Sequence, residues 1–419
     1  MDEEPIPALR PLELVPLTHE GRRLFLLRDP AGVADEAIIM PPASAELLAF
    51  CDGEHSVRDV QTAIARATGQ IVPVEQIRGF VAKLDANGFL DSPAYAERRR
   101  AIAHAYATAP ARPTHFAGQA YAADPDALRR ELDALFATEA GPGRPAAACA
   151  APPAAIVAPH IDPVRGAAAY AHAYAPLWGA RPERILALGV LHAPSRDPFV
   201  LTGKDYATPL GAMRTDVRRV HALAQGLGWD PLEEEELHRA EHSIEFQVLM
   251  LQHALSEGGT RPLEPAPELL PVLCSFSTEA FGETLEAAAR RAQIDAFLQA
   301  LRALLAEDPV PTLIVAGVDL SHLGPRFGDP GEVSASRAEE IGRRDRATLE
   351  RLATGDAAGF VAEILREGND RRLCGFGALY ALLALLGPTR GRVLHYDQSR
   401  EPSGLVSFAA LAFEGPVRE

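Results

Sequence analysis

The sequence is poor in cysteine and in lysine. Its 419 residues include four cysteines, which lie far apart and form no C-x-x-C pair. This spacing predicts reduced thiols in the core rather than a disulfide framework. Lysine occurs only at Lys83 and Lys204, so that arginine supplies nearly all of the positive charge. We interpret this, together with the many alanines and prolines, as compositional bias rather than as part of a site.

Long apolar runs and excess positive charge are also missing. No segment approaches the roughly 20 apolar residues that a membrane span needs. The acidic start "MDEEPIPALR" has neither the basic region nor the apolar run of a signal peptide. A formal net charge of −16 disfavours nucleic acid or an anionic membrane as the main partner. We therefore expect a cytoplasmic protein that binds neither.

Residues 1–100 are expected to form a small domain of their own. Two apolar runs within residues 22–40 flank a Pro-Ala-Gly turn and predict a β-hairpin. A short helix should follow in residues 43–55. The next helix should start at Ser56, whose capping-box partner is Asp59, and stop at Gly69. A third helix should end at Asn87-Gly88, before a final turn and strand. Together these elements make a winged-helix-like pattern.

This pattern resembles the PqqD-like domains that bind peptides beside radical-SAM enzymes. A DNA-binding winged helix is the alternative, but residues 1–100 carry 11 basic and 16 acidic residues, which argues against DNA. A scaffold or dimerisation role also stays open. We expect residues 101–111 to be a linker and residues 112–415 to be the larger domain.

Beyond residue 154, short apolar runs alternate with amphipathic helical segments. This alternation predicts an α/β domain with a central sheet flanked by helices. Three of the runs, at 156–158, 185–190 and 313–318, end on a histidine or on Asp-x-Ser-His. Because active sites in α/β sheets lie at the carboxyl ends of strands, these three ends predict a functional site.

The stretch "HRAEHSIEFQ" (238–247) suggests another kind of site. It begins with H-x-x-E-H, the motif of a class of zinc peptidases in which two histidines one helical turn apart hold zinc. Such an enzyme needs a further acidic ligand from a later helix, and no residue of the sequence stands out for that role. The peptidase is an alternative that the structure has to decide.

A set of ordered motifs in residues 112–415 resembles the Memo family. These motifs include "VAPHIDPVRGAAAYAHAY" (157–174), "LGVLHAP" (188–194), "EHSIEFQ" (241–247), "AGVDLSHLG" (316–324) and "LCGFGA" (373–378). As a set, in this order, they are specific. Prokaryotic members of the family are called AmmeMemoRadiSam system protein B. The resemblance implies two partners, a radical-SAM protein and an AMMECR-type protein.

The resemblance also implies a fold similar to that of class III extradiol dioxygenases, with a metal held over the strand ends. In Memo proteins of animals the ligands are two histidines and a cysteine. Carried over to this sequence, the metal ligands are His160 and His192, and the third position is Ser321. The expected cofactor is a divalent metal, iron or copper. A neutral hydroxyl is a weak ligand, so Ser321 leaves the set incomplete.

Four residues are expected to act in catalysis: His242, Asp319, Ser321 and His322. The resemblance makes His242 the pocket histidine and a natural general base, and it leaves His238 on the surface. In "GVDLSH", Asp319 either binds the metal or caps the next helix, and His322 supplies a nitrogen that Ser321 lacks.

A Ser–His–Asp hydrolase is the rival interpretation of "GVDLSH". Adjacent Ser and His side chains do not easily reach triad geometry, and the sequence has no G-x-S-x-G elbow. Nearby, Glu241 and Glu245 are expected to orient the His242 ring or to cap a helix. Cys374 is expected to be a buried thiol, and Tyr206 and Arg165 to line the pocket.

Two functions are consistent with these features. The first is a non-haem metal-dependent redox or dioxygenase-like enzyme that works within a radical-SAM system, as the strand-end histidines indicate. The second is a non-catalytic accessory protein that binds metal or peptide for a radical-SAM partner, as the serine at position 321 indicates.

Overall fold

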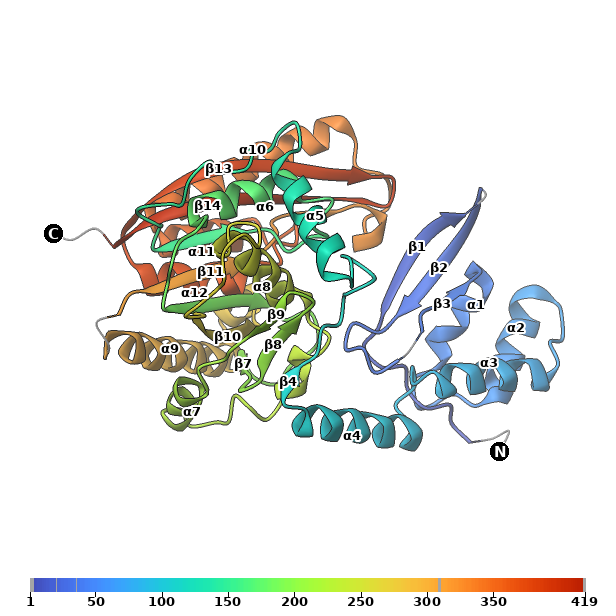
Figure 1. Ribbon diagram of the computed structural model, residues 1–419. Helices are drawn as coiled ribbons and strands as arrows, with labels where there is room; N and C mark the ends of the chain where they lie inside the picture. Colours follow the sequence, from blue (N-terminus) through green and yellow to red (C-terminus); the bar gives the residue numbers. More distant parts are fainter. Residues whose placement is uncertain (1–3, 20, 35, 308–309, 417–419) are drawn as a thin grey trace. The chain divides into compact units, whose positions relative to one another are not determined.

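The computed structural model describes residues 4–19, 21–34, 36–307 and 310–416. The chain divides into two compact units, Met1–Ala109 with Pro325–Gly328, and Pro110–Gly324 with Asp329–Glu419 (Figure 1). The division falls after helix α4 (Pro93–Thr108). This helix runs across residue 100, where the small domain was expected to end. Each unit is described by itself below.

The first unit contains a three-stranded antiparallel sheet in the order β1-β2-β3. Its strands are β1 (Glu13–His19), β2 (Arg22–Arg28) and β3 (Ile38–Met40). The predicted hairpin is confirmed, because β2 pairs with β3 through Phe25–Met40 and Leu27–Ile38. Strand β1, which the sequence analysis did not anticipate, pairs with β2 along its whole length.

Short helices complete the first unit. They are α1 (Pro42–Glu46), η1 (Leu47–Phe50), α2 (Val57–Thr68), α3 (Val74–Ala86) and α4. The predicted capping box is confirmed, since the Ser56 side chain accepts the Asp59 N–H while the Asp59 carboxylate accepts the Ser56 N–H. Gly69 ends α2 in the left-handed conformation, as expected for a glycine stop. The likeness to winged-helix domains stays a prediction.

The second unit is built on an eight-stranded sheet, which confirms the predicted α/β architecture. Seven strands follow the order β12-β14-β5-β11-β6-β10-β7, and β13 pairs with β14. The strands are β5 (Ala155–Ala158), β6 (Arg184–Val190), β7 (Phe199–Leu201), β10 (Glu268–Cys274), β11 (Thr312–Gly317), β12 (His322–Leu323), β13 (Thr389–Glu401) and β14 (Gly404–Pro416). Strands β5, β11, β6 and β10 are parallel neighbours. They are buried and read as continuous apolar runs, as parallel strands do.

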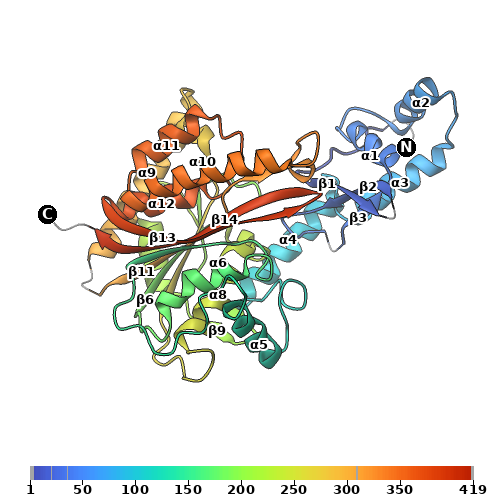
Figure 2. The same ribbon diagram turned by 90° about the horizontal axis from the view of Figure 1, so that it is seen from above.

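Helices cover both faces of this sheet (Figure 2). On one face lie α5 (Pro125–Phe136), α6 (Ala167–Tyr174) and α8 (His242–Leu255). On the other lie α9 (Leu285–Ala306), α10 (Ala335–Thr354), α11 (Ala357–Arg366) and α12 (Phe376–Leu386). Helix α7 (Val217–Gln225) contacts α9. Short 3-10 turns are η2 (Ala175–Leu177), η3 (Glu235–His238) and η4 (Thr278–Phe281), whereas η5 (Pro325–Phe327) belongs to the first unit.

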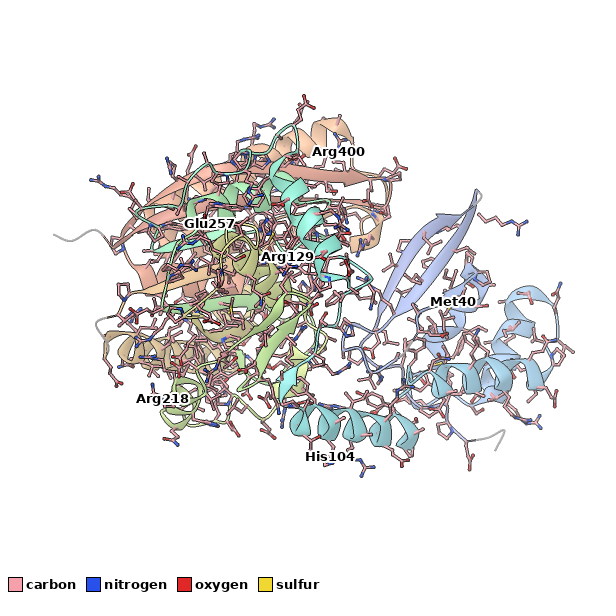
Figure 3. All side chains as sticks on the ribbon, in the orientation of Figure 1. Met40, His104, Arg129, Arg218, Glu257 and Arg400 are labelled. Carbon is pink, nitrogen blue, oxygen red and sulfur yellow. The ribbon has the colours of Figure 1, made fainter. Side chains whose placement is uncertain are left out.

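A small sheet and an exposed polar surface complete the second unit. The sheet has the order β4-β8-β9, with strands β4 (Ala111–Arg112), β8 (Asp205–Thr208) and β9 (Gly211–Met213). Charged side chains such as Arg218 and Arg400 are exposed (Figure 3). Among the described residues, no helix has both the length and the apolar character that a membrane crossing requires.

Two glycines let α8 approach the strand ends closely. A Cβ atom on Gly189 would lie 2.6 Å from side-chain atoms of Ile244 and Ser243, and one on Gly317 would lie 2.6 Å from Gln247 Nε2 and the Ser243 carbonyl. Any larger residue would push the helix away from β6 and β11. The first turn of α8 therefore lies directly beside the carboxyl ends of these strands.

Candidate metal centre

The three strand ends predicted to carry a site are neighbours in the sheet. His160 follows β5, His192 follows β6, and Asp319 follows β11, which lies between them. Because the three strands are parallel, their carboxyl ends meet at one edge, and the side chains that follow them gather there. The structure thus brings these side chains together, and their role as a functional site stays a prediction.

Helix α8 adds a third imidazole. The helix begins at His242, with Glu241 as its N-cap, so the expected helix start at this motif is also confirmed. The ring centroids of His160, His192 and His242 lie 4.8–5.1 Å apart. The His160 side chain is 2% exposed, whereas those of His192 and His242 are 30% and 28% exposed. The cluster is therefore open to solvent on the side of His192 and His242.

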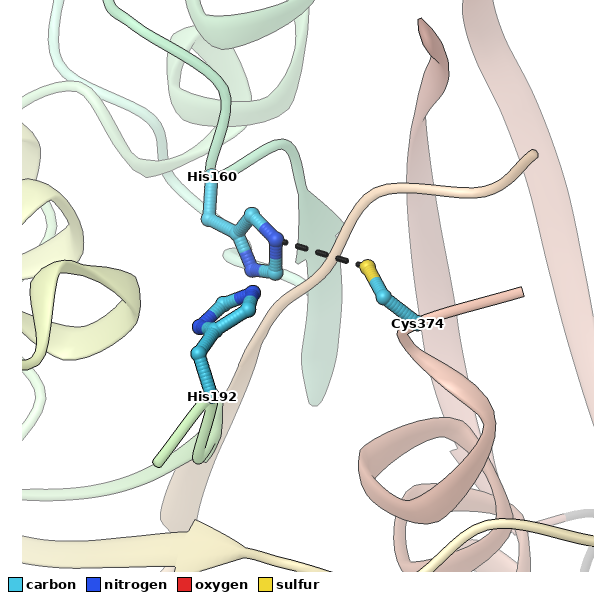
Figure 4. A group of neighbouring side chains, drawn as sticks. All are labelled: His160, His192 and Cys374. Atoms are coloured by element: carbon cyan, nitrogen blue, oxygen red, sulfur yellow. Dashed lines mark hydrogen bonds between the residues drawn. The ribbon is translucent and has the colours of Figure 1, made fainter. Parts of the chain in front are cut away.

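Cys374 completes a group of three metal-binding side chains. It lies in the segment between α11 and α12, and its Sγ is 3.4 Å from His160 Nε2. Figure 4 shows the thiol pointing toward the His160 ring with His192 beside it. One donor atom each from His160, His192 and Cys374 lie within 4.8 Å of one another.

The spacing of these atoms fits a metal ion. Tetrahedral coordination with a metal–sulfur bond of about 2.3 Å and a metal–nitrogen bond of about 2.05 Å places sulfur and nitrogen about 3.6 Å apart. The observed separation between Cys374 and His160 is close to this value. Two imidazoles and a thiolate suit zinc, copper or iron, and not the oxygen-loving magnesium or calcium.

The structure contradicts the assignment of Ser321 to the third position. The Ser321 side chain is fully buried, and its hydroxyl donates a 2.6 Å hydrogen bond to Asp345. Asp345 also accepts hydrogen bonds from Arg371, Tyr396 and Ser407. Because Ser321 belongs to this buried polar network, it has no free donor atom for the histidine cluster. Cys374, predicted to be a buried thiol, lies instead beside the two histidines, in a group that could hold a metal ion.

Each of the two metal-binding histidines has one ring nitrogen already occupied. His160 Nδ1 donates to the Gly317 carbonyl at 3.0 Å, and His192 Nδ1 donates to the Glu241 carboxylate at 3.0 Å. Hydrogen bonding of one ring nitrogen fixes the tautomer and leaves the other nitrogen as the donor. In both residues Nε2 is thus the atom left for a metal.

Burial and charge act differently on the three rings. Burial and the neighbouring His192 lower the pKa of His160 to about 3. Burial also lowers the pKa of His242 to about 3, although Glu241 opposes this change. For His192, burial favours the neutral ring, but Glu241 and Cys374 outweigh it and raise the pKa well above its usual value. Burial raises the pKa of the Cys374 thiol. His160 and His242 are therefore neutral at pH 7, whereas His192 has to release a proton before its Nε2 can bind a cation.

Asp319 and His322 lie beside the cluster. The Asp319 carboxylate accepts the backbone N–H groups of His160 and Ile161, and its second oxygen lies 3.7 Å from His160 Nε2. Burial raises the pKa of Asp319 to about 6. His322 Nδ1 donates to the carbonyls of Leu320 and Arg372. Asp319 thus holds the loop that carries His160, whereas the backbone holds the His322 ring.

Glu245, one turn after the site on α8, anchors one wall of the centre. Its buried carboxylate pairs with Arg112 and accepts hydrogen bonds from Tyr121 and from the backbone N–H groups of His115 and Phe116. The Phe116 ring meets the His242 ring edge-on at 5.7 Å. We call residues 112–121 the wall segment. None of its residues was predicted to belong to the site.

His238 is buried, which contradicts its predicted place on the surface. Its Nε2 donates to the Val200 carbonyl at 3.0 Å, so its Nδ1 accepts from the Tyr206 hydroxyl at 2.7 Å. With both nitrogens occupied, His238 has no donor for zinc, and the peptidase interpretation fails. Tyr206 and Arg165 do not line the centre either, because Tyr206 binds His238 and Arg165 binds Ser399 and Glu401.

Comparisons with known proteins agree on one family. The family described as Memo-like protein matches residues 112–411. A MEMO1 family protein of Aquifex aeolicus is 27% identical over 399 residues, which cover 93% of this chain and 96% of that protein. One of Thermus thermophilus is 28% identical over 85% of this chain and 97% of its own. One of Methanopyrus kandleri is 27% identical over 71% of this chain and 96% of its own.

Proposed function

The chain belongs to the Memo-like protein family, and on this premise we propose that it is a metal-dependent redox enzyme with its centre at His160, His192 and Cys374. The observation that carries the proposal is the convergence of two imidazole nitrogens and one thiol from three separate segments of the chain. No packing requirement explains why a thiol should lie against two imidazoles at a strand-end edge open to solvent.

The three ligands have different supports and therefore different roles. His160 is the buried, rigid ligand, because the Gly317 carbonyl fixes its ring and Asp319 fixes its backbone. His192 is the partly exposed ligand on the open side. Cys374 supplies negative charge once its proton has left, which favours a borderline or soft cation. An iron or copper ion held here would supply one-electron chemistry.

His242 is the proposed general base. Its ring lies beside both histidine ligands, is about one-quarter exposed, and is neutral at pH 7 because burial lowers its pKa. A neutral imidazole at the open side of the centre can accept a proton from a bound molecule. Phe116 of the wall segment packs against this ring and limits its movement.

The finer assignment is a dioxygenase-like reaction within a radical-SAM system, with a radical-SAM protein and an AMMECR-type protein as partners. It is supported by the site's position over parallel strand ends, by the histidine pair, and by the neutral base beside it. A substrate would reach the centre on the side of His192 and His242, whose rings are partly exposed.

A non-catalytic accessory role is the second candidate, and the first unit favours it. The similarity to the Aquifex aeolicus protein covers 93% of this chain, so it includes part of the first unit. A family member that carries an additional compact unit with a peptide-binding pattern could present a peptide to a radical-SAM protein. In this role the metal centre would store or deliver the ion.

Metal analysis of variants tests the proposal. The full-length protein, purified without added metal, should contain iron or copper near one equivalent. His160→Ala and His192→Ala should each lose it while keeping the circular dichroism spectrum of the folded chain. His242→Ala should keep the metal. Absence of metal binding by the wild-type protein under any supply of iron, copper or zinc would refute the metal centre.

The same variants separate the two functions. If the protein is an enzyme, His242→Ala should lower turnover by about 10²-fold or more, the usual contribution of a general base. If it is an accessory protein, His242→Ala should leave stimulation of the radical-SAM partner intact.

A further inference from the structure

Glu241 makes more contacts than a helix cap requires. One carboxylate oxygen accepts the His192 backbone N–H at 2.9 Å and lies 3.0 Å from the ring Nδ1 of the same residue. The other accepts the Ser243 N–H at 2.9 Å and lies 3.2 Å from His242 Nδ1. The carboxylate is 4% exposed. The Ser243 contact caps α8, whereas the contacts to His192 and His242 have no capping role.

We propose that Glu241 is the positioning residue of the metal centre. Its carboxylate fixes the tautomer and the direction of the His192 ring and holds the His242 ring beside it. The inference rests on the proposed metal centre. One carboxylate would then position both His192, the ligand that is not fully buried, and His242, the base beside it.

The physical reason lies in the hydrogen-bond inventory of a carboxylate. An ionised carboxylate only accepts, so the ring nitrogen facing it must carry the proton. Once metal binding has removed the proton from Nε2, His192 therefore keeps its remaining proton on Nδ1 and presents the Nε2 lone pair to the ion. His160 obtains the same tautomer from a backbone carbonyl. Because His192 is 30% exposed, packing holds its ring less firmly, and the carboxylate is its main restraint.

Direct binding of the metal by Glu241 is the competing explanation. Donor atoms of His192, Glu241 and His242 do lie within 4.8 Å of one another. Both oxygens of Glu241, however, already accept backbone N–H groups, and its ring contacts are to the Nδ1 atoms rather than to Nε2. The carboxylate thus acts through the rings.

Two substitutions separate positioning from capping. In Glu241→Gln the amide oxygen can still accept the Ser243 N–H, but the NH₂ group faces the His192 backbone N–H and ring. The Nδ1–H of His192 then loses its acceptor at 3.0 Å and keeps only the oxygen at 3.2 Å, which it shares with the Ser243 N–H, so the ring is held less firmly. In Glu241→Ser a good N-cap side chain remains but is too short to reach His192.

Glu234 offers a matched control in the same loop region. Its side chain is also largely buried, 10% exposed, and it accepts hydrogen bonds from the Ser195 hydroxyl and the Arg196 N–H. None of its contacts is to a histidine of the centre. Glu234→Gln therefore makes the same chemical change at a carboxylate that binds Ser195 and Arg196, a few residues after His192, and it leaves the proposed ligands untouched.

The test is Zn(II) affinity of the full-length apo-protein by competition with a chelating dye. Removal of an outer-shell partner typically weakens metal binding by about 10–100-fold. We expect this loss in both Glu241 variants, with one-to-one stoichiometry retained, and an unchanged affinity in Glu234→Gln. The thiolate-to-metal charge-transfer band of the Co(II) form should persist, because Cys374 is untouched. In the Zn(II) form, ring nitrogen NMR should show the His192 proton on Nδ1 in the wild type and a shifted Nδ1–H signal in Glu241→Gln.

Several outcomes would overturn the inference. Wild-type affinity in both Glu241 variants would do so, as would an unchanged His192 Nδ1–H signal in the Zn(II) form of Glu241→Gln. Equal losses in Glu234→Gln and Glu241→Gln would show a general effect of removing a buried carboxylate. If the wild-type protein binds no Zn(II) or Co(II), the proposed metal centre itself has failed, which is a different result from a wild-type protein that binds metal without help from Glu241.

Discussion

Replacing Cys374 by serine should weaken metal binding far more than any change at Ser321. Four-ligand zinc sites bind with apparent free energies of about 10–16 kcal/mol, or about 2.5–4 kcal/mol for each ligand. Since tenfold in affinity is about 1.4 kcal/mol, loss of the thiolate should cost about 10²–10³-fold. The Sγ atom lies 3.4 Å from His160 Nε2, at the distance two ligands of one ion would have, so no other side chain can replace it without movement.

Ser321→Ala is the matched control, because it removes a hydroxyl two residues after Asp319 that donates only to Asp345. A hydrogen bond to a charged group contributes about 1.5–3 kcal/mol to stability. This variant should therefore unfold at a lower urea concentration yet bind Zn(II) as the wild type does. Cys374→Ser should do the reverse, with little change in apo-protein stability. The reasoning is refuted if Ser321→Ala loses the metal while Cys374→Ser keeps it.

Three further predictions concern other parts of the chain. His238→Ala should lower the free energy of unfolding by about 2–4 kcal/mol in urea titrations, because it removes a buried ring and its hydrogen bonds to the Tyr206 hydroxyl and the Val200 carbonyl, and metal per folded protein should stay unchanged. Burial lowers the pKa of His253, so the stability that its neutral ring supports is present above about pH 6.5, the ordinary value, and is lost as the pH falls below it. His253→Gln should thus lose less stability than the wild type between pH 7 and pH 5; an equal loss would contradict this. The full-length protein should show no salt-sensitive affinity for duplex DNA at micromolar concentrations in gel-shift assays, since residues 1–100 carry a net negative charge.

Much of the fold could be predicted because local pattern and tertiary structure agree. The capping box at Ser56 and the glycine stop at Gly69 are decided within one helical turn, and both appear as predicted. The parallel strands read as buried apolar runs because both of their faces are covered by helices. Strand β1 was missed because "ELVPLTH" mixes apolar residues with a proline and shows no clean alternation.

The candidate site could be predicted only where sequence and sheet topology coincide. His160 and His192 follow strands directly, so the ends of neighbouring parallel strands bring them together. Cys374 lies 214 residues after His160, on a segment that follows a helix, and no local pattern reveals that it reaches the same edge. The signal that could have identified it was the motif "LCGFGA", in which the thiol precedes the glycines at the start of α12.

The burial of His238 could not be read from its neighbours. It follows the run "EEEE", which normally marks an exposed segment, but only part of that run faces solvent: Glu234 is buried and Glu235 accepts the Thr202 hydroxyl and the Gly203 N–H. A buried arginine also donates to the His238 carbonyl. These partners come from segments distant in sequence, so charge density alone gave the wrong prediction.

The wall segment makes the place of the His242 ring depend on a carboxylate elsewhere on α8. Glu245 accepts the backbone N–H groups of His115 and Phe116, and the Phe116 ring meets the His242 ring edge-on. Loss of the Glu245 carboxylate would therefore loosen Phe116 and also remove the ion pair with Arg112. A substitution one helical turn from His242 would in this way widen the range of orientations open to its ring, although both aromatic rings would be unchanged.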